Sequence, residues 1–358
     1  MRPACAAGAC SKGSSAKSRP PDGRRGTRVR ARSGDRAVTA EQRLQVRLAR
    51  REAEAEGIAR FELTAVDDGP LPAFTAGAHV DVLLGDGLVR QYSLCGSPAD
   101  RSRYQLGVLL DPASRGGSRA MHALAEGVTL QISAPRNHFE LAAGGRRHLL
   151  LAGGIGVTPL LCMAEQLAAE GRTFALHYCT RSPARTGFMR RIGASPWSDR
   201  ARFHFDDGPT EQRLDLAALL ATPEPDVHLY VCGPQGFMDA ALAAARAAGW
   251  AEPQIHYEYF AAAPVARDAD AEFELKLARS GRIVTVGRSQ TTAQALAEAG
   301  VALPVSCEQG VCGTCLTRVL EGVPDHRDMY LTPAEQARND QFTPCCSRSR
   351  TPSLLIDL

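Results

Sequence analysis

The sequence predicts a multidomain protein with an antiparallel β-barrel, an α/β domain built on a parallel sheet, and a smaller α+β domain. Three observations support this fold class. Residues 40–143 contain short runs of alternating apolar and polar residues, residues 144–262 alternate apolar runs with glycine-rich turns and helices, and residues 270–358 carry a group of closely spaced cysteines. A chain of 358 residues has room for two or three domains, each with its own core.

The segment before these domains, residues 1–39, is predicted to be a disordered basic tail. Residues 1–36 hold ten Lys and Arg against two Asp, a local charge of +8 in a chain of net charge +3, so the remainder is acidic at −5. The tail nearly lacks large apolar residues, so burial cannot offset its ordering entropy. A stretch upstream of the true start, a transit peptide and a nucleic-acid arm are the alternatives. The charge of the whole chain gives no reason to expect a nucleic-acid partner.

The 11 cysteines are an odd number, and most of them lie far apart in the sequence. No apolar signal sequence is evident, so a secreted disulfide scaffold is disfavoured. The longest uncharged stretch lies between Arg147 and Glu165 and includes Pro159. It is shorter than the roughly 18 residues that suggest a membrane-spanning helix. We therefore expect no membrane insertion.

The first domain, residues 40–143, is predicted to be the barrel because short half-buried strands follow one another with little helix between them. The alternating runs are residues 44–48, 58–63 and 80–84, and the predicted turns are residues 67–70 and 85–87.

Two further segments of this domain have the chemistry of a phosphate or ring site. The run 90–94 places Arg90, Tyr92 and Leu94 on one face of a strand and Gln91 and Ser93 on the other. Later, a glycine pair with a hydroxyl precedes a predicted helix over 119–125, and such a helix start presents backbone N–H groups suited to a phosphate. That pair lies in the sequence Arg115, Gly116, Gly117, Ser118. An ordinary strand and an ordinary helix cap are the alternatives.

The second domain, residues 144–262, alternates strand and helix. A strand over 148–152 is followed by a glycine-rich turn over 153–159 and a helix to about Ala169. Further strands are predicted over 174–179 and 227–232, and Gly233 and Pro234 then open a helix over 237–248. This repeat is typical of an open parallel sheet that places dinucleotide phosphates at the carboxyl ends of its strands. The turn is not a GxGxxG motif, so a turn that only packs a helix on a strand is the alternative.

The third domain, residues 270–358, carries the strongest signal, a set of cysteines at 307, 312 and 315 followed by a pair thirty residues later, namely Cys307, Cys312, Cys315, Cys345 and Cys346. The C-x4-C-x2-C spacing is that of plant-type [2Fe–2S] proteins. Two irons need four thiolates, and three of them from one short loop require that loop to wrap around the cluster. Gly310 and Gly313 lie where tight, positive-φ conformations are needed and where N–H groups can point at the sulfurs.

Around this loop we predict strands over 273–277 and 283–286, and a helix that begins with the capping box of Thr291 and Gln294 and stops at Gly300. Four cysteines can also hold zinc, although the usual paired CxxC arrangement is absent. Disulfides are the remaining alternative.

The order of these motifs resembles the phthalate dioxygenase reductase family, and within it the vanillate O-demethylase type of reductase. The similarity covers about residues 42–358. Residues 90–94 match the RxYSL flavin motif of the family, and residues 115–118 match its second flavin segment. Residues 135–139 match the PxNxF turn that closes the barrel. The resemblance implies a flavin-binding barrel, a nucleotide-binding α/β domain and a β-grasp ferredoxin domain.

The resemblance also implies roles for residues near the flavin. Arg90 would be associated with the FMN phosphate, and Tyr92 and Ser93 would line the isoalloxazine, with Leu94 beside them. Residues Gly116, Gly117 and Ser118 would complete the phosphate site. Phe260, in the segment 257–260 that covers the flavin in the family, is a candidate stacking residue.

For the nicotinamide nucleotide, the resemblance implies two segments that border the pyrophosphate and the nicotinamide, with the contacts Gly153, Gly154, Gly156, Thr158, Pro159, Cys232, Gly233 and Pro234. We expect Ser93, Thr158 and Cys232 to lie closest to the reacting rings. In the cluster domain the implied ligands are Cys307, Cys312, Cys315 and Cys345, and Cys346 is the alternative for the fourth position. His326, near the cluster loop in the family pattern, is expected to have a structural role in a turn.

The function implied is electron transfer from NADH through FMN and a [2Fe–2S] cluster to a Rieske-type oxygenase that acts on an aromatic substrate. Hydride carries an electron pair, which a cluster cannot accept at once, whereas a flavin can take the pair and release electrons singly. Thiolate ligation needs reduced cysteines, so a cytoplasmic setting is expected. The alternatives are an FAD-containing reductase of another oxygenase and a non-enzymatic ferredoxin-type electron carrier. Arg181 and Arg185 follow the second strand, where a 2′-phosphate could be met, so NADPH is the alternative to NADH.

Overall fold

The computed structural model describes residues 43–85, 88–112, 114, 116–260 and 270–358. The predicted tail over residues 1–39, the last two residues of the predicted turn at 85–87, and Arg115 lie outside the described residues. Among the described residues, no helix is both long and apolar enough to cross a membrane.

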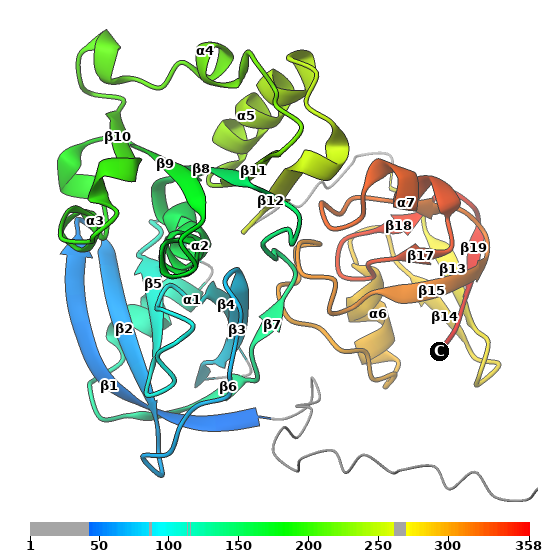
Figure 1. Cartoon of the computed structure of the whole chain (residues 1–358). Coiled ribbons are helices and arrows are strands. Elements are labelled where there is room, and N and C mark those ends of the chain that lie inside the picture. Colours follow the sequence, from blue (N-terminus) through cyan, green and yellow to red (C-terminus); the bar gives the residue numbers. More distant parts are fainter. Residues whose placement is uncertain (1–42, 86–87, 113, 115, 261–269) are drawn as a thin grey trace, which may run out of the picture. The chain divides into compact units, whose positions relative to one another are not determined.

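Antiparallel strands form the first part of the chain (Figure 1), and their sheet runs in the order β4-β3-β6-β1-β2-β5 with β7 paired to β3. An isolated bridge between Leu94 and Leu106 joins the end of β4 to β5, so the two edges of the sheet meet. One short helix, α1 (Gly117–Ala123), follows β5. The strands are β1 (Arg43–Ala55), β2 (Ile58–Ala65), β3 (Ala78–Leu83), β4 (Val89–Ser93), β5 (Tyr104–Leu109), β6 (Thr129–Ser133) and β7 (Arg136–Asn137). The barrel predicted from alternating apolar residues is therefore the fold of this segment.

The second sheet is parallel, with five strands in the order β10-β9-β8-β11-β12. The chain winds outward from β8 through β9 to β10, then returns to the other side of β8 for β11 and β12, so the winding direction switches between β8 and β11. The strands are β8 (Arg147–Gly153), β9 (Thr173–Thr180), β10 (Ala201–Phe205), β11 (Val227–Cys232) and β12 (Ile255–Glu258), and the helices are α2 (Val157–Ala169), α3 (Met189–Gly193), α4 (Leu216–Leu220) and α5 (Gln235–Ala247).

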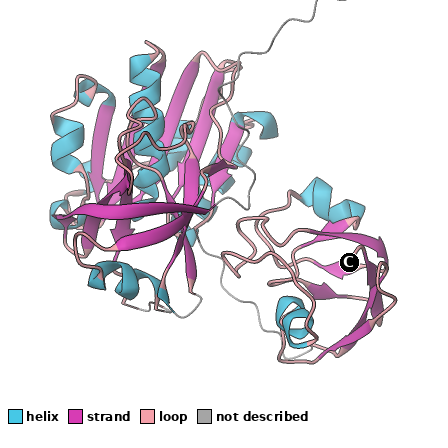
Figure 2. Ribbon diagram, turned by 90° about the horizontal axis from the view of Figure 1, so that it is seen from below, coloured by secondary structure: helices cyan, strands magenta, loops and turns pink. Residues whose placement is uncertain are grey.

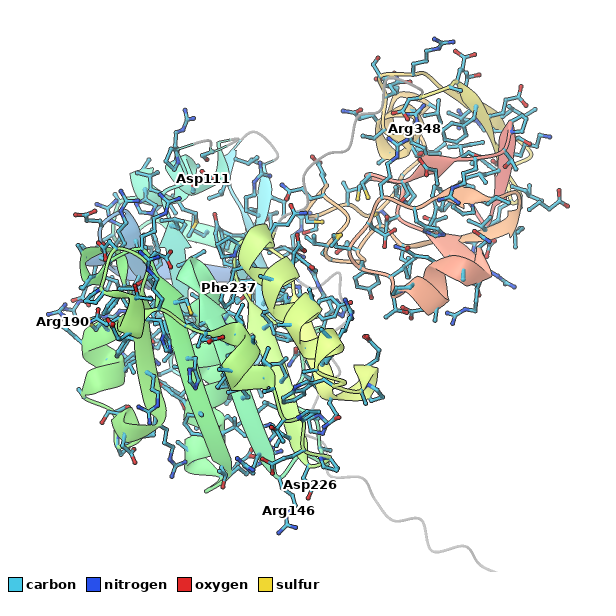
Figure 3. All side chains as sticks on the ribbon, turned by 90° about the horizontal axis from the view of Figure 1, so that it is seen from above. Asp111, Arg146, Arg190, Asp226, Phe237 and Arg348 are labelled. Carbon is cyan, nitrogen blue, oxygen red and sulfur yellow. The ribbon has the colours of Figure 1, made fainter. Side chains whose placement is uncertain are left out.

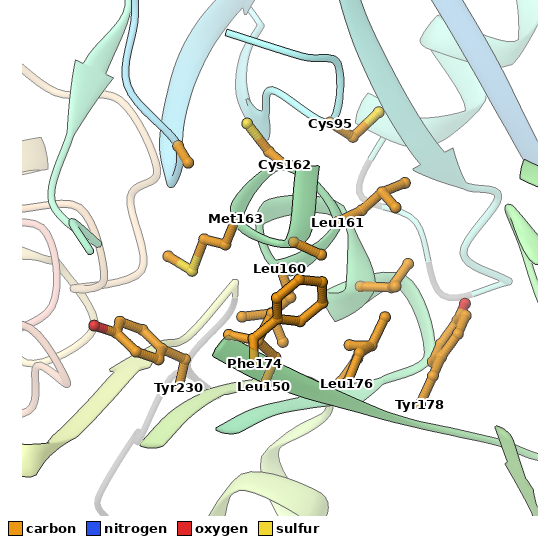
Figure 4. Packing of buried hydrophobic residues seen from close by; sticks show 14 of the residues in the cluster. Cys95, Leu150, Leu160, Leu161, Cys162, Met163, Phe174, Leu176, Tyr178 and Tyr230 are labelled. Atoms are coloured by element: carbon orange, nitrogen blue, oxygen red, sulfur yellow. The ribbon is translucent and has the colours of Figure 1, made fainter. Parts of the chain in front are cut away.

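Helices cover both faces of this sheet (Figures 1 and 2). Alternate residues of one strand show the division: Leu150 of β8 packs with α2, whereas Leu151 packs in the cluster that includes α5. Helix α2 is apolar almost all round, because barrel residues pack on its other side. Among them is Cys95, which lies near Cys162 of α2 (Figure 4). A few barrel residues therefore join the core on the α2 side of the parallel sheet, while the barrel also has a separate core of its own, as expected.

The third sheet is mixed and has the order β14-β13-β19-β15-β17, with α6 packed against it. Strand β13 alternates buried and exposed residues, as its sequence predicts. Helix α6 begins with the predicted capping box of Thr291 and Gln294. The elements are β13 (Phe273–Leu277), β14 (Ile283–Val286), α6 (Thr292–Glu298), β15 (Thr317–Glu321), β16 (Pro324–Asp325), α7 (Pro333–Arg338), β17 (Gln341–Phe342), β18 (Arg348–Ser349) and β19 (Ser353–Ile356). This is the predicted α+β arrangement.

Candidate cofactor and electron-transfer sites

The Arg90 side chain lies against the start of α1. A Cβ atom added to Gly117 would come within 2.5 Å of Arg90 Cγ and 2.7 Å of its Nε, so a glycine is needed for the arginine to pass this close. Gly116, one residue earlier, has φ +94°, a left-handed conformation that favours glycine. The Ser118 hydroxyl accepts a hydrogen bond from the backbone N–H of Asp111 at 3.1 Å. The structure thus brings together the residues that the sequence assigned to a phosphate.

The other residues of the flavin motif divide between the two faces of β4. Leu94, which follows the strand, is fully buried in the barrel core, and Tyr92 packs against the same core. Burial raises the pKa of Tyr92 to about 12. Gln91 and Ser93 face the opposite side, as the alternation predicts. Of Tyr92 and Ser93, which were predicted to line the flavin ring, only Ser93 has its side chain on the face of β4 that lines a cavity. The side chain of Leu94 belongs to the barrel core.

The two glycine-rich turns of the parallel sheet lie side by side at the carboxyl ends of β8 and β11. A Cβ on Gly156 would lie 2.3 Å from the carbonyl oxygen of Cys232, and one on Gly233 would lie 2.9 Å from Gly153 Cα. Phe237, near the start of α5, packs against Gly153 and Gly233 and so covers both turns. The opposite, amino ends of the two strands lie at Arg146 and Asp226 (Figure 3). These glycines therefore allow the two turns to pack closely, as expected of turns that only pack a helix on a strand. They do so at the switch point of the sheet, where open α/β sheets bind their ligands.

Two polar residues of these turns are buried. The Thr158 hydroxyl donates to the carbonyl of Ile155 at 3.0 Å, within its own turn. Cys232, at the end of β11, is fully buried. Burial, with a smaller contribution from Glu258, raises the pKa of the Cys232 thiol well above its ordinary value. Cys232 is thus a neutral thiol. Of the other predicted residues of the first turn, Gly154 has φ +51° and Pro159 is buried in the first turn of α2.

A small cavity of about 40 Å³ lies where the barrel, the end of β12 and the cysteine loop meet. Its lining residues come from five segments: His79, Gln91, Ser93, His138, Glu258, Tyr259, Phe260, Val311 and Cys312. The Ser93 hydroxyl donates to Glu258 Oε2 at 3.5 Å, and His79 Nδ1 lies 3.9 Å from Glu258 Oε1. Three residues that the sequence analysis selected from separate motifs line this cavity, namely Ser93, Phe260 and Cys312.

Burial decides the charge state around the cavity. It raises the pKa of Glu258 to about 8 and is only partly opposed by the Ser93 hydrogen bond. Burial lowers the pKa of His79 to about 4, with a further contribution from Arg136. Near neutral pH, Glu258 is therefore mostly protonated and His79 is uncharged.

The cysteines predicted as cluster ligands lie on two loops, one between α6 and β15 and the other between β17 and β18. All four are at least nine-tenths buried: Cys307, Cys312, Cys315 and Cys345. The backbone N–H of Gln309 donates to Cys307 Sγ at 3.3 Å, and that of Thr314 donates to Cys312 Sγ at 3.4 Å. Such N–H donors stabilise negative charge on sulfur, which suits thiolate ligands.

The four sulfurs also interact with one another. Cys307 hydrogen-bonds with Cys312 and Cys345, and these contacts lower the pKa of its thiol; Cys345 also contacts Cys315. A [2Fe–2S] cluster takes two thiolates on each of two irons, so its ligands come in pairs. The donor set thus fits the cluster.

Both glycines of this loop have positive φ, as predicted, with +72° at Gly310 and +69° at Gly313. A Cβ on Gly310 would lie 2.4 Å from Cys346 Sγ, and one on Gly313 would lie 2.2 Å from the Tyr330 ring. Cys346 itself contacts Thr343 Oγ1 at 3.3 Å and Ser347 Oγ at 3.8 Å. The Cys346 thiol therefore has hydroxyl partners beside its contact with Cys345, whereas Cys345 contacts two other predicted ligands, Cys307 and Cys315.

The model of the 2Fe-2S iron-sulfur cluster binding domain family matches residues 275–350, which confirms the predicted [2Fe–2S] domain. The chain is 56% identical over 307 residues to the vanillate O-demethylase oxidoreductase of Pseudomonas putida, covering 85% of this chain and 96% of that protein. It is also 37% identical to the phthalate dioxygenase reductase of Burkholderia cepacia, covering 88% and 97%. The chain belongs to the phthalate dioxygenase reductase family.

Solved structures agree with this membership. The chain matches a structure described as "phthalate dioxygenase reductase: a modular structure for electron transfer from pyridine nucleotides to [2Fe-2S]", with a TM-score of 0.70 at 36% identity, over 88% of this chain and 98% of that one. It also matches an intact type IV self-sufficient cytochrome P450 monooxygenase, with a TM-score of 0.78 at 38% identity, over 88% of this chain and 41% of that one. Residues 131–255 match a second family model, the N-terminal domain of dimethylamine monooxygenase subunit DmmA-like proteins.

Sequence reasoning missed several residues of this reductase. Glu258 lies in the segment 257–260, from which only Phe260 was selected. His79 was not selected from the sequence either, and it lines the cavity beside Ser93. The contact between Asp81 and Ser306, described below, was also missed. An acidic residue between apolar neighbours in a strand, as at Asp81, is the one signal that could have indicated it.

Proposed function

We propose that the chain is the reductase component of an oxygenase system and passes electrons from NADH, through FMN and its [2Fe–2S] cluster, to a Rieske-type oxygenase. One observation carries this proposal: the cavity that Ser93 and Glu258 border is also bordered by Val311 and Cys312 of the cysteine loop. A ring held against Ser93 would thus lie between the nucleotide turns and the cluster. The names of relatives support an oxygenase partner, among them the carnitine monooxygenase reductase subunit of Escherichia coli at 40% identity.

Different residues would bind the FMN phosphate and the nicotinamide nucleotide. Arg90 would bind the FMN phosphate as a charge-assisted partner, with Gly116, Gly117 and Ser118 beside it. The two turns with Gly153, Gly154, Gly156, Thr158, Pro159, Cys232, Gly233 and Pro234 would hold the nicotinamide nucleotide. When bound, FMN supplies the step from paired to single electrons that neither NADH nor the cluster provides. Ser93 orients its hydroxyl towards Glu258, which holds a proton at a carboxyl oxygen, and no general base is needed.

The cluster ligands would be Cys307, Cys312, Cys315 and Cys345, and Phe260 would cover the flavin. Reduced thiolates fit a cytoplasmic setting. The segment boundaries proposed are 40–143 for the flavin domain, 144–262 for the nucleotide domain and 270–358 for the cluster domain.

The test separates flavin reduction from cluster reduction. In Cys312→Ala, we expect NADH-dependent reduction of cytochrome c to be abolished, while reduction of ferricyanide, which can accept electrons from the flavin, is retained. Loss of both activities with a normal flavin content would contradict the proposal. Mass spectrometry of the released flavin distinguishes FMN from FAD, and a preparation with no flavin would favour a simple electron carrier.

A further inference from the structure

A buried carboxylate joins the barrel to the loop that holds the predicted cluster ligands. The Ser306 hydroxyl donates to Asp81 Oδ1 at 2.8 Å, across 225 residues of sequence. Ser306 and Asp81 are 5% and 8% exposed. Ser306 immediately precedes Cys307, so this hydrogen bond holds the loop next to its first thiol.

Asp81 is itself fixed on the barrel side. Arg136 Nη2 donates to Asp81 Oδ2 at 2.7 Å, and the backbone N–H of Asp81 donates to the Ser133 hydroxyl at 2.9 Å. A buried carboxylate is stable only when its oxygens have hydrogen-bond partners. Arg136 and Ser306 supply one partner to each oxygen, so removal of either leaves one buried carboxylate oxygen without that partner.

The same face of β3 and β4 carries Asp81 and the cavity residues. Asp81 pairs with Gln91 across the two strands, and His79 pairs with Ser93. Directly paired residues lie on one face of a sheet, so Asp81 is on the side of Gln91 and Ser93. The loop with Cys307 is thus attached to the surface against which the flavin would lie.

A second contact accompanies the first. His138, in the turn after β7, meets the edge of the Tyr330 ring with centroids 6.0 Å apart. Tyr330 in turn packs on Gly313 between Cys312 and Cys315. Two separate contacts therefore link the barrel to the loop.

We propose that Asp81 is a positioning residue: by holding Ser306, it sets the separation between the flavin face and the cluster and so the rate of electron transfer between them. This proposal rests on the proposed function. In the step concerned, one electron leaves the reduced flavin and converts one ferric iron to ferrous, and no bond forms or breaks. Electron-transfer rates fall steeply with distance, so a looser loop slows this step and leaves reduction of the flavin by NADH unchanged.

The test compares the holoprotein with Asp81→Asn, Ser306→Ala, the double variant and Ser306→Thr, which keeps the hydroxyl. Asp68→Asn, at an exposed acidic residue, is the matched control. Hydrogen exchange of peptides covering 78–83 and 304–316 reports on the contact without turnover. We expect protection of the loop to fall about tenfold or more in Ser306→Ala, because a hydrogen bond to a charged group contributes enough for such a change in an opening equilibrium.

Rapid mixing with NADH then resolves the two reductions. We expect slower cluster reduction in Asp81→Asn and Ser306→Ala, an unchanged rate of flavin reduction, and recovery in Ser306→Thr. The double variant should be no slower than the slower single variant, because both remove one interaction. If Asp81→Asn does not fold, Ser306→Ala carries the test alone.

Unchanged loop protection and unchanged cluster reduction in Ser306→Ala would overturn the positioning role and leave the proposed function intact. Loss of cluster content or an altered electron paramagnetic resonance signal would also overturn it, because Ser306 would then retain the cluster rather than position it. Absence of flavin reduction in the unmodified protein would instead contradict the proposed function.

Discussion

The Ser93 hydroxyl donates to Glu258 Oε2 at 3.5 Å and thereby connects the end of β4 with the end of β12, 165 residues later. Glu258 is also close enough to Cys232 to contribute to the raised pKa of that thiol. The ends of β4 and β11, which carry the predicted flavin and nucleotide motifs, therefore meet at one largely buried carboxyl group. This is the place where a nicotinamide and a flavin ring would have to approach each other.

The largely buried carboxyl group of Glu258 predicts a pH-dependent stability. Burial raises the pKa of Glu258 from 4.5 to about 8, so the folded state binds this proton more tightly than the unfolded state. Its contribution to stability is complete below about pH 4.5 and is lost as pH rises through about 8. Between pH 5 and 8.5, we expect the unfolding free energy of the unmodified protein to fall relative to Glu258→Gln, by on the order of 4 kcal/mol.

Denaturant titration at several pH values measures this difference. Glu211→Gln, at an exposed glutamate, should follow the unmodified protein at every pH. Parallel curves for Glu258→Gln and the unmodified protein would show that Glu258 is already ionised when folded.

The two adjacent cysteines give a matched pair of variants. We expect Cys345→Ser to lose most of the cluster, because Cys345 contacts the predicted ligands Cys307 and Cys315. Cys346→Ser should retain it, because Cys346 contacts Cys345 alone of the predicted ligands and has hydroxyl partners in Thr343 and Ser347. Iron content and visible absorption of the purified variants measure the difference. The opposite pattern would assign the fourth ligand to Cys346.

The close contact between Arg90 and Gly117 predicts an effect on the flavin. In Gly117→Ala, the new methyl group would lie 2.5 Å from Arg90 Cγ, so the arginine has to move away from the phosphate site. We expect FMN affinity to fall by about tenfold or more, since a charge-assisted hydrogen bond contributes about 1.5–3 kcal/mol.

Fluorescence titration of the flavin-free protein with FMN measures this affinity. Gly193→Ala is the control, because a Cβ there meets no atom within 4 Å. Equal affinities for both variants would place the phosphate elsewhere.

Gly156 tests the nucleotide turns. A Cβ at this position would lie 2.3 Å from the backbone carbonyl oxygen of Cys232, so Gly156→Ala must separate the two turns. We expect a raised KM for NADH with normal flavin and cluster content, together with a loss of stability of about 1–3 kcal/mol from overpacking. Steady-state kinetics and denaturation measure the two effects, and an unchanged KM would exclude these turns from nucleotide binding.

Local sequence patterns predicted strands and helices well where the alternation of apolar and polar residues, or a capping box, marks the element. The strands predicted over 227–232, 273–277 and 283–286 coincide with β11, β13 and β14, and the capping box marks the start of α6. The loop of Cys307 was predictable because its spacing is itself a geometric requirement of the cluster. The positive φ of Gly310 and Gly313 follows from the same requirement.

Contacts between segments far apart in the sequence were not predictable in this way. The apolar character of α2 indicates burial, but nothing local shows that the barrel covers its second side. The Asp81–Ser306 hydrogen bond and the burial of Glu258 depend on how separate domains meet, which no periodicity encodes. Sequence reasoning therefore selected the residues of single motifs and missed those that connect them.

The central claim is that electrons enter as a pair at the flavin and leave singly through the cluster. Anaerobic rapid mixing of the purified protein with NADH, followed by absorbance and freeze-quenched electron paramagnetic resonance, tests it most directly. The account predicts that flavin absorbance bleaches first, that the signal of the reduced cluster follows, and that NADPH reacts more slowly than NADH. A cluster that is reduced without prior bleaching of a flavin, or a protein that NADH leaves oxidised, would contradict it.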